Sequence, residues 1–350
     1  MSRLGFFQAA CVLACVGLLA APGVGQLSVD RLYHHVDRPL TVTVAAPESA
    51  ATPAPTAPPA LDIPRDVDAE PAPLAIELRR PVDGRPVARV QVAVGSADLA
   101  QLFPRLWKPT SVEPAPVYYA QLLRGDEPLG PALVLQPMLT PMRATAADQR
   151  GLTVRFNPVG PAYFAGYRVY VDQRVLIDTS LGEMEFALHP DAAPNTVWNF
   201  RELARGGFYD GTIFHRIIGS GSPGKGFMVQ GGDPLGNGLG GPGFAIPLES
   251  SSLDHDFGVL SMARLSSPDT AGAQFFIALS RDAAKPLDRA YAAFGQLTKG
   301  AGVLRRLGAV RVSPDDRPFE PPVIRRVRLV DAPPYTGIVP EREVTDIKDR

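Results

Sequence analysis

The sequence predicts a mainly β protein with two folded parts, and three observations lead to that prediction. Short runs that alternate apolar and polar residues recur after residue 73, and Pro and Gly interrupt them at short intervals. Only two stretches have the apolar spacing of a helix. A length of 350 residues leaves room for about two domains.

The composition is that of a folded protein that does not bind nucleic acid through bulk charge. Apolar residues make up 45% of the chain, which is enough for a sizeable core. The 35 Lys and Arg residues are balanced by 36 Asp and Glu residues, so no basic excess exists to displace counterions. We therefore expect no nucleic-acid partner.

Residues 1–25 have the pattern of an export signal. Arg3 supplies a positive start, residues 4–21 are mostly apolar, and small residues precede a possible cleavage point before Gln26. An uncleaved membrane anchor is the alternative, because the apolar run approaches spanning length. We expect export to the periplasm or the extracellular space of a bacterium.

Both cysteines of the chain, Cys11 and Cys15, fall inside this segment. Lipid modification at Cys15 is a further alternative, but the apolar run continues past it, where a lipidated chain normally turns polar. Cleavage before Gln26 would leave a mature chain with no disulfide and no thiol chemistry.

Residues 26–73 read as an N-terminal segment and a linker. A short strand is predicted over 40–44, and residues 45–73 are rich in Ala and Pro with few large apolar groups. Such a stretch cannot bury enough surface to offset its ordering entropy, so an extended linker is expected.

Residues 74–172 are predicted to form a small β-rich domain of unknown role. Strand candidates at 74–78 and 87–94 flank the turn signal Pro81-Val82-Asp83-Gly84, which predicts a hairpin. The remaining strand candidates in this part are 116–123, 132–135, 152–156 and 167–171.

The last part of the chain begins with another hairpin, predicted from strands at 175–177 and 184–188. Residues 196–205 have helical spacing and stop at Gly206-Gly207, and residues 297–307 are predicted to form a second helix. The polar tail at 333–350 is expected to be irregular. These patterns alone do not distinguish a barrel from a sandwich.

Two blocks carry the most information about function. Phe214-His215-Arg216-Ile217-Ile218 is followed, after a Gly-rich interruption, by residues 226–233, Gly-Phe-Met-Val-Gln-Gly-Gly-Asp. An arginine and a glutamine among large apolar residues suit a surface that grips an extended peptide. Further blocks at 193–200, 258–263, 272–277, 287–288 and 294–295 follow in order. Over residues 173–332 the chain resembles the cyclophilins, the cyclosporin-binding class of peptidyl-prolyl isomerases.

The resemblance implies an eight-stranded antiparallel barrel capped by two helices, and an isomerase of X-Pro bonds that needs no cofactor or metal. It places Arg216 at the catalytic position, although an arginine there could also be a surface ion-pair residue. The positions that it implies for substrate binding are Phe227, Met228, Gln230, Ala263, Gln274, Phe276, Leu287 and Tyr291. Core packing is the alternative for the apolar members. His215 is expected to support the site by packing or hydrogen bonding.

Several positions depart from the family pattern. Arg264 stands where Asn is frequent and adds charge to the groove, and Pro286 stands where Trp or His is frequent, which speaks against cyclosporin sensitivity. Tyr291 replaces a frequent His. The insertion Gly219–Lys225 has the glycine and lysine spacing of a phosphate loop, but an extended segment follows it instead of a helix, so that reading fails. His34-His35 with Asp37 is not expected to bind a metal.

Two main hypotheses remain at this point. The first is an isomerase that assists the folding of exported polypeptides, and its expected partners are unfolded or flexible proline-containing chains. The second is a module that binds proline-containing segments with little or no turnover. A third reading gives the functional role to residues 74–172, as a domain that docks the protein to a partner.

Overall fold

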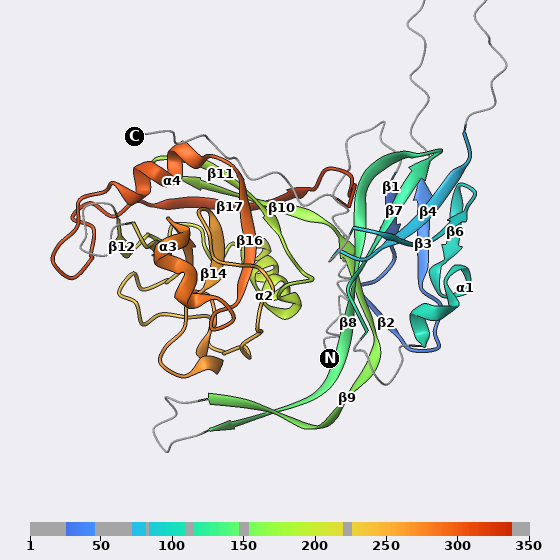
Figure 1. The fold of residues 1–350 in the computed structure, drawn as a ribbon, viewed down its shortest axis with the longest axis horizontal. Helices are drawn as coiled ribbons and strands as arrows, with labels where there is room; N and C mark the ends of the chain where they lie inside the picture. The colour runs from blue at the N-terminus through green and yellow to red at the C-terminus, as the bar shows by residue number, and fades with distance from the viewer. Residues whose placement is uncertain are drawn as a thin grey trace, which may run out of the picture.

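In the computed structural model, residues 26–45, 72–81, 84–108, 115–146, 154–219 and 226–337 are described. Their strands form three antiparallel sheets in two lobes that lie side by side (Figure 1). We call residues 26–172 the N-terminal lobe and residues 173–331 the C-terminal lobe. The predicted signal segment 1–25 and nearly all of the predicted linker lie outside the described residues.

The N-terminal lobe packs a three-stranded sheet against a six-stranded one. The small sheet has the order β1-β3-β6, with β1 at Gln26–Val29, β3 at Thr41–Ala45 and β6 at Gly95–Asp98. The large sheet has the order β2-β9-β8-β7-β4-β5. Its strands are β2 (Tyr33–His35), β4 (Leu74–Arg79), β5 (Pro86–Gln91), β7 (Tyr118–Arg124), β8 (Glu127–Ala146) and β9 (Val154–Val171). A short helix α1 (Leu99–Leu102) and a 3-10 turn (Pro104–Trp107) follow β6.

Residues near the predicted start of the mature chain contribute to this lobe's core. Leu27, Leu40 and Val42 are fully buried and pack in one cluster with Ile76 and Leu122 of the large sheet. The strand predicted over 40–44 is present as β3, and the hairpin predicted around residues 81–84 is present as the antiparallel pair β4–β5.

The structure corrects the division of residues 127–171 into short strands. The candidates at 132–135 and 167–171, and the described residues 154–156 of the candidate at 152–156, are parts of two long paired strands, β8 and β9. Register shifts near Met138 and Thr140 let the pair bend, so that its far end leaves the large sheet and passes beside the C-terminal lobe (Figure 1). The amide of Phe156 donates a 2.8 Å hydrogen bond to the Asp269 carboxylate there.

The C-terminal lobe is a curled eight-stranded antiparallel sheet, as the resemblance implied. Its order is β12-β13-β15-β14-β16-β11-β10-β17. The strands are β10 (Gln173–Thr179), β11 (Gly182–Leu188), β12 (Arg216–Ile218), β13 (Met228–Gly231), β14 (Val259–Met262), β15 (Phe275–Ala278), β16 (Ala293–Lys299) and β17 (Ile324–Asp331). Hydrogen bonds from Gly211 N to Ile324 O (2.8 Å) and from Phe214 N to Pro322 O (2.9 Å) join its two edges.

Two helices cover the barrel core with their apolar faces. Helix α2 (Pro194–Arg205) matches the prediction for 196–205 and buries Val197 and Phe200. Helix α4 (Ala301–Gly308) buries Leu304 and Leu307. The prediction of a helix from residue 297 was wrong at its start, because residues 297–299 end β16. Gly300, with a φ of 96°, then separates strand from helix.

The remaining short elements are α3 (Arg281–Ala284) and two 3-10 turns at Pro268–Thr270 and Lys285–Leu287. No helix among the described residues is long and apolar enough to span a membrane.

The two lobes are joined by aromatic and cationic side chains. On α2, Arg201 lies 4.0 Å from the ring centre of Tyr170 on β9, and Trp198 lies beneath Arg168 at 4.3 Å. After β17, residues 332–337 cross to the N-terminal lobe without regular structure, as predicted for the start of the tail. There Tyr335 stacks on Tyr119 with ring centres 4.1 Å apart.

Candidate active site

Four neighbouring strands of the barrel place the predicted polar and apolar groups in one row. Arg216 on β12 pairs in register with Gln230 on β13, and Gln230 pairs with Phe276 on β15. Phe276 in turn pairs with Ser261 on β14. Residues that face each other across a register share one side of a sheet, so these side chains lie on the same face. Their sequence neighbours Ile217, Val229, Ile277 and Leu260 are fully buried in the barrel core.

The outward face carries a separate apolar cluster beside this row. This cluster is distinct from the main core and contains Ile218 and six of the predicted substrate-binding residues. Those six are Phe227, Met228, Ala263, Phe276, Leu287 and Tyr291. Met228, Ala263 and Phe276 are buried, and the others are partly exposed. Phe276 meets Tyr291 edge to face at 5.9 Å. These side chains pack in a cluster separate from the main barrel core, and their role in substrate binding stays a prediction.

The two predicted glutamines are hydrogen-bonded to each other and hold a glycine-rich loop. Gln230 Nε2 donates to Gln274 Oε1 at 3.0 Å, and Gln274 Nε2 donates to the carbonyls of Gly238 (3.0 Å) and Gly240 (2.9 Å). Asp233 accepts from the amides of Leu235 and Asn237 and folds the same loop. A hollow of about 190 Å³ adjoins the apolar cluster. It is lined by residues that include Gln230, Ala263 and Gln274.

Arg216 is held only weakly. Its side chain is 48% exposed, and one guanidinium nitrogen lies 3.5 Å from the Asp316 carboxylate. Exposed ion pairs of this kind contribute about 0–1 kcal/mol. The guanidinium can therefore turn toward a bound peptide at small cost. In the protein without peptide, Arg216 is thus a surface ion-pair residue. Its catalytic role stays a prediction.

His215 is buried next to the arginine and takes no part in a polar chain. Burial lowers the pKa of the imidazole, and a backbone hydrogen bond with Ile213 opposes this shift only in part. The ring lies against Gly238 of the glycine-rich loop. A neutral packing residue fits the supporting role that was expected for it.

The structure reveals a hydrogen-bonded network behind Phe276 that sequence reasoning missed. The ring of His255 stacks on Phe276 at 5.9 Å, and its two nitrogens lie 3.2 Å from Asp288 Oδ1 and 2.9 Å from Ser261 Oγ. Arg281 binds both carboxylate oxygens of Asp288, at 3.0 and 2.7 Å, and holds the pKa of that carboxyl well below its usual range. Burial lowers the pKa of His255, so a neutral ring supports the pocket wall.

Where the chain departs from the family pattern, the structure shows how the site accommodates the change. The Arg264 guanidinium lies 4.2 Å from the ring centre of Tyr291 and donates to the carbonyls of Leu265 and Ala290. It is thereby held at the rim of the pocket. Most of the insertion Gly219–Lys225 lies outside the described residues. Its flanks are joined by a 3.0 Å bond from Gly226 N to Gly219 O, so the pairing of β12 with β13 is kept.

No group of three or more acidic, His or Cys side chains in the described part of the chain is arranged to hold a metal ion. His34 instead lies within 3.0 Å of the Arg31 carbonyl.

Comparison with known proteins agrees with this geometry. The family model described as "Cyclophilin type peptidyl-prolyl cis-trans isomerase/CLD" matches residues 174–329. Peptidyl-prolyl cis-trans isomerase-like 1 of Rhizopus delemar is 42% identical over 153 residues, which cover 42% of this chain and 87% of the relative. The human protein of the same name is 40% identical over 151 residues, which cover 42% of this chain and 86% of that protein.

A solved cyclophilin-type isomerase of Cryptosporidium parvum, crystallised in the presence of the dipeptide Ala-Pro, is 35% identical. It covers 46% of this chain and 100% of its own, with a TM-score of 0.42.

Proposed function

The chain belongs to the cyclophilin-type peptidyl-prolyl cis-trans isomerase family, and we propose that its C-terminal lobe isomerises X-Pro bonds of exported polypeptides and so assists their folding. The observation that carries this proposal is the row Arg216–Gln230–Phe276 beside an outward apolar cluster. A cation, an amide and an apolar pocket are thereby placed on one open face.

The reaction needs differential binding and no covalent chemistry. The barrier to rotation of a peptide bond is about 18–20 kcal/mol, and lowering it to a millisecond time scale takes roughly 7 kcal/mol at about 1.36 kcal/mol per decade. The site must therefore bind the twisted amide better than either planar form.

Each part of the face has a role in such binding. The apolar cluster around Met228, Phe276 and Leu287 would hold the pyrrolidine ring. The Arg216 guanidinium would donate a hydrogen bond to the prolyl nitrogen as that nitrogen becomes pyramidal. Gln230 and Gln274, already fixed by their mutual bond, would orient the peptide backbone and the arginine.

Isomerisation of an Ala-Pro test peptide by the purified chain tests the activity. We expect catalysis, and we expect Arg216→Ala to lower it at least roughly tenfold, which corresponds to about 1.4 kcal/mol. Arg325→Ala is the matched control, because Arg325 also pairs with a surface carboxylate, Asp178, but lies on β17. A folded protein without catalysis would favour the alternative, a module that binds proline-containing segments.

The proposal that the substrates are exported polypeptides rests on residues 1–25, with their apolar run and the small residues before Gln26. Expression of the whole chain in a bacterium should give a periplasmic or secreted protein. Its intact mass should be that of a chain that begins at Gln26. A cytoplasmic protein that retains residues 1–25 would contradict the proposal of export and leave the isomerase proposal standing.

A further inference from the structure

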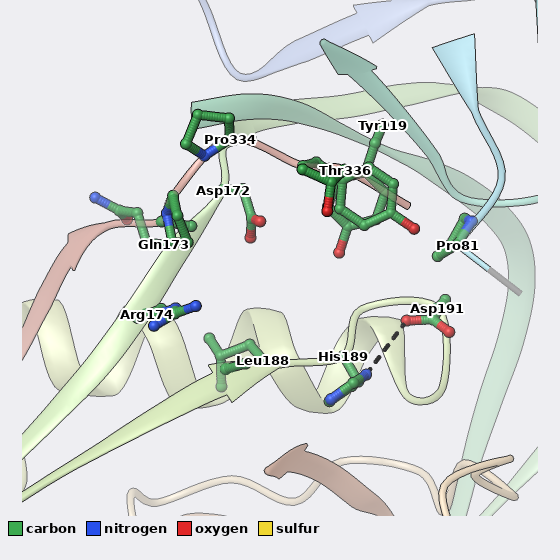
Figure 2. A pocket seen from close by; sticks show the side chains of 14 residues that line it. Pro81, Tyr119, Asp172, Gln173, Arg174, Leu188, His189, Asp191, Pro334 and Thr336 are labelled. Atoms are coloured by element: carbon green, nitrogen blue, oxygen red, sulfur yellow. Dashed lines mark ion pairs between the residues drawn. The ribbon is translucent and has the colours of Figure 1, made fainter. Parts of the chain in front are cut away.

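A second cavity, far from Arg216 in the fold, lies between the two lobes. It has a volume of about 300 Å³, which is the lower end of the range for small-molecule sites. Figure 2 shows Tyr119 of β7, Asp172 of the β9–β10 junction, and His189 and Asp191 after β11 around one open space. The segment at 332–336 completes the wall.

Two carboxylates face this space, one from each lobe. Asp172 ends the N-terminal lobe, and Asp191 belongs to the turn before α2. Among the described residues, the one basic side chain within ion-pair distance of the Asp191 carboxylate is His189, whose Nδ1 lies 4.0 Å away, and burial lowers the pKa of that imidazole. A neutral ring does not compensate the Asp191 charge.

The Asp172 carboxyl also lacks an ion-pair partner among the described residues. Desolvation raises the pKa of this carboxyl to about 7, even though the charges of Arg201 and Arg174 act in the opposite direction. Arg201 does not line the cavity; it donates to Gln173 Oε1 at 2.7 Å and lies over the Tyr170 ring.

The remaining cation at the wall, Arg174, is bound to Glu185 on β11. Glu185 in turn accepts from Lys299 at 2.9 Å. The cavity thus has two acidic acceptors and no free cation among the described residues that line it. The aromatic side chains Tyr119 and Tyr335 form one end of it as a stacked pair.

We propose that this interlobe cavity binds an organic cation, an alkylammonium or alkylguanidinium group, between the carboxylates of Asp172 and Asp191 and beside the Tyr119–Tyr335 pair. An anion would face two carboxylates. A metal ion is not favoured, because no three acidic, His or Cys side chains of the described residues are arranged to hold one. An organic cation would donate hydrogen bonds to both carboxylates and compensate their negative charge. The aromatic rings of Tyr119 and Tyr335 would add a cation–π attraction.

The cation can come from a free small molecule or from a Lys or Arg side chain of a bound polypeptide. In either case the ligand touches both lobes and the segment at 332–336, so its binding would stabilise their docked arrangement by mass action. This inference is independent of the proposed isomerase activity, because no residue of the outward apolar cluster lines the cavity.

Calorimetric titration of the purified whole chain tests the site. The probes are n-butylguanidinium, the peptide acetyl-Gly-Arg-Gly-amide, and the neutral analogue n-butanol. We expect saturable binding of at least one cationic probe, with affinity at least tenfold lower in Asp172→Asn and in Asp191→Asn. Asp178→Asn is the matched control on β10, since its carboxylate pairs with Arg325 away from the cavity.

The two cationic probes distinguish the sources. Binding of butylguanidinium as tightly as the peptide indicates a small-molecule site, and binding of the peptide alone indicates a polypeptide partner. Ala-Pro isomerisation should be unchanged in Asp172→Asn, which also shows that the variant is folded. Absence of binding by either cation, equal binding of n-butanol, or undiminished binding by both folded aspartate variants would overturn the proposal.

Discussion

The two faces of β12, β13, β15 and β14 are built from alternate residues of the same segments, and they do different work. The inward face is uniformly apolar and fully buried, with Ile217, Val229 and Ile277 in the barrel core. The outward face carries Arg216, Gln230 and Phe276 on an open surface. Stability and function are therefore separated by a single step along the chain, and substitutions on the two faces should have opposite profiles.

The largest effect is expected on the inward face. Ile277→Ala removes a fully buried side chain from the core and should lower the free energy of unfolding by about 2–5 kcal/mol. Urea denaturation measures it. The specific activity of the fraction that remains folded should stay close to that of the unsubstituted protein. A loss below about 1 kcal/mol would mean that this face is not the core.

The reverse profile is expected on the outward face. Leu287→Ala opens the wall of the apolar cluster, where the side chain is only partly buried. We expect kcat/KM for an Ala-Pro peptide to fall roughly tenfold, since apolar pocket contacts contribute about 1–3 kcal/mol. The loss in unfolding free energy should be less than half of that for Ile277→Ala. Unchanged kcat/KM would remove Leu287 from the site.

The pH dependence of stability tests the interlobe cavity independently of the outward face. The folded pKa of Asp172 is raised to about 7, so the folded state takes up a proton more readily than the unfolded state. Ionisation then costs stability, and the unfolding free energy should fall as pH rises from about 4 to about 7. The difference between the unsubstituted protein and Asp172→Asn isolates this effect from other titrating groups. A difference that is flat across this range would contradict the raised pKa.

The smallest effect is expected for the carboxylate beside the catalytic candidate. Asp316→Asn removes an exposed ion pair with Arg216, and both stability and the activation free energy should change by less than about 1 kcal/mol. Steady-state kinetics at low salt checks this. A tenfold loss of kcat/KM would instead show that Asp316 positions the arginine.

The sequence predicted those parts of the molecule that have a local pattern. Alternation and turn residues located β3, the β4–β5 hairpin and the β10–β11 hairpin, and helical spacing located α2. The start of α4 was misplaced because Leu297 belongs to the alternating end of β16 while also fitting a helical spacing. The continuity of β8 and β9 was missed because prolines interrupt both strands and read as strand ends.

The candidate site divides in the same way. The row and the apolar cluster were predicted from the family resemblance, residue by residue, and the structure brings these residues together. The network of His255, Ser261, Arg281 and Asp288 was missed because its members are far apart in the sequence and form no local pattern. The interlobe cavity was missed for the same reason, since β7, the β9–β10 junction and residues after β17 supply its wall.

The measurement that tests the central claim most directly compares ground-state and transition-state binding at the outward face. Arg216→Ala should lower kcat/KM for an Ala-Pro peptide at least roughly tenfold while changing the peptide's Kd by less than about threefold, because the guanidinium is assigned to the twisted amide. Equal losses in kcat/KM and in affinity would contradict the account, since Arg216 would then bind the planar and twisted amides alike.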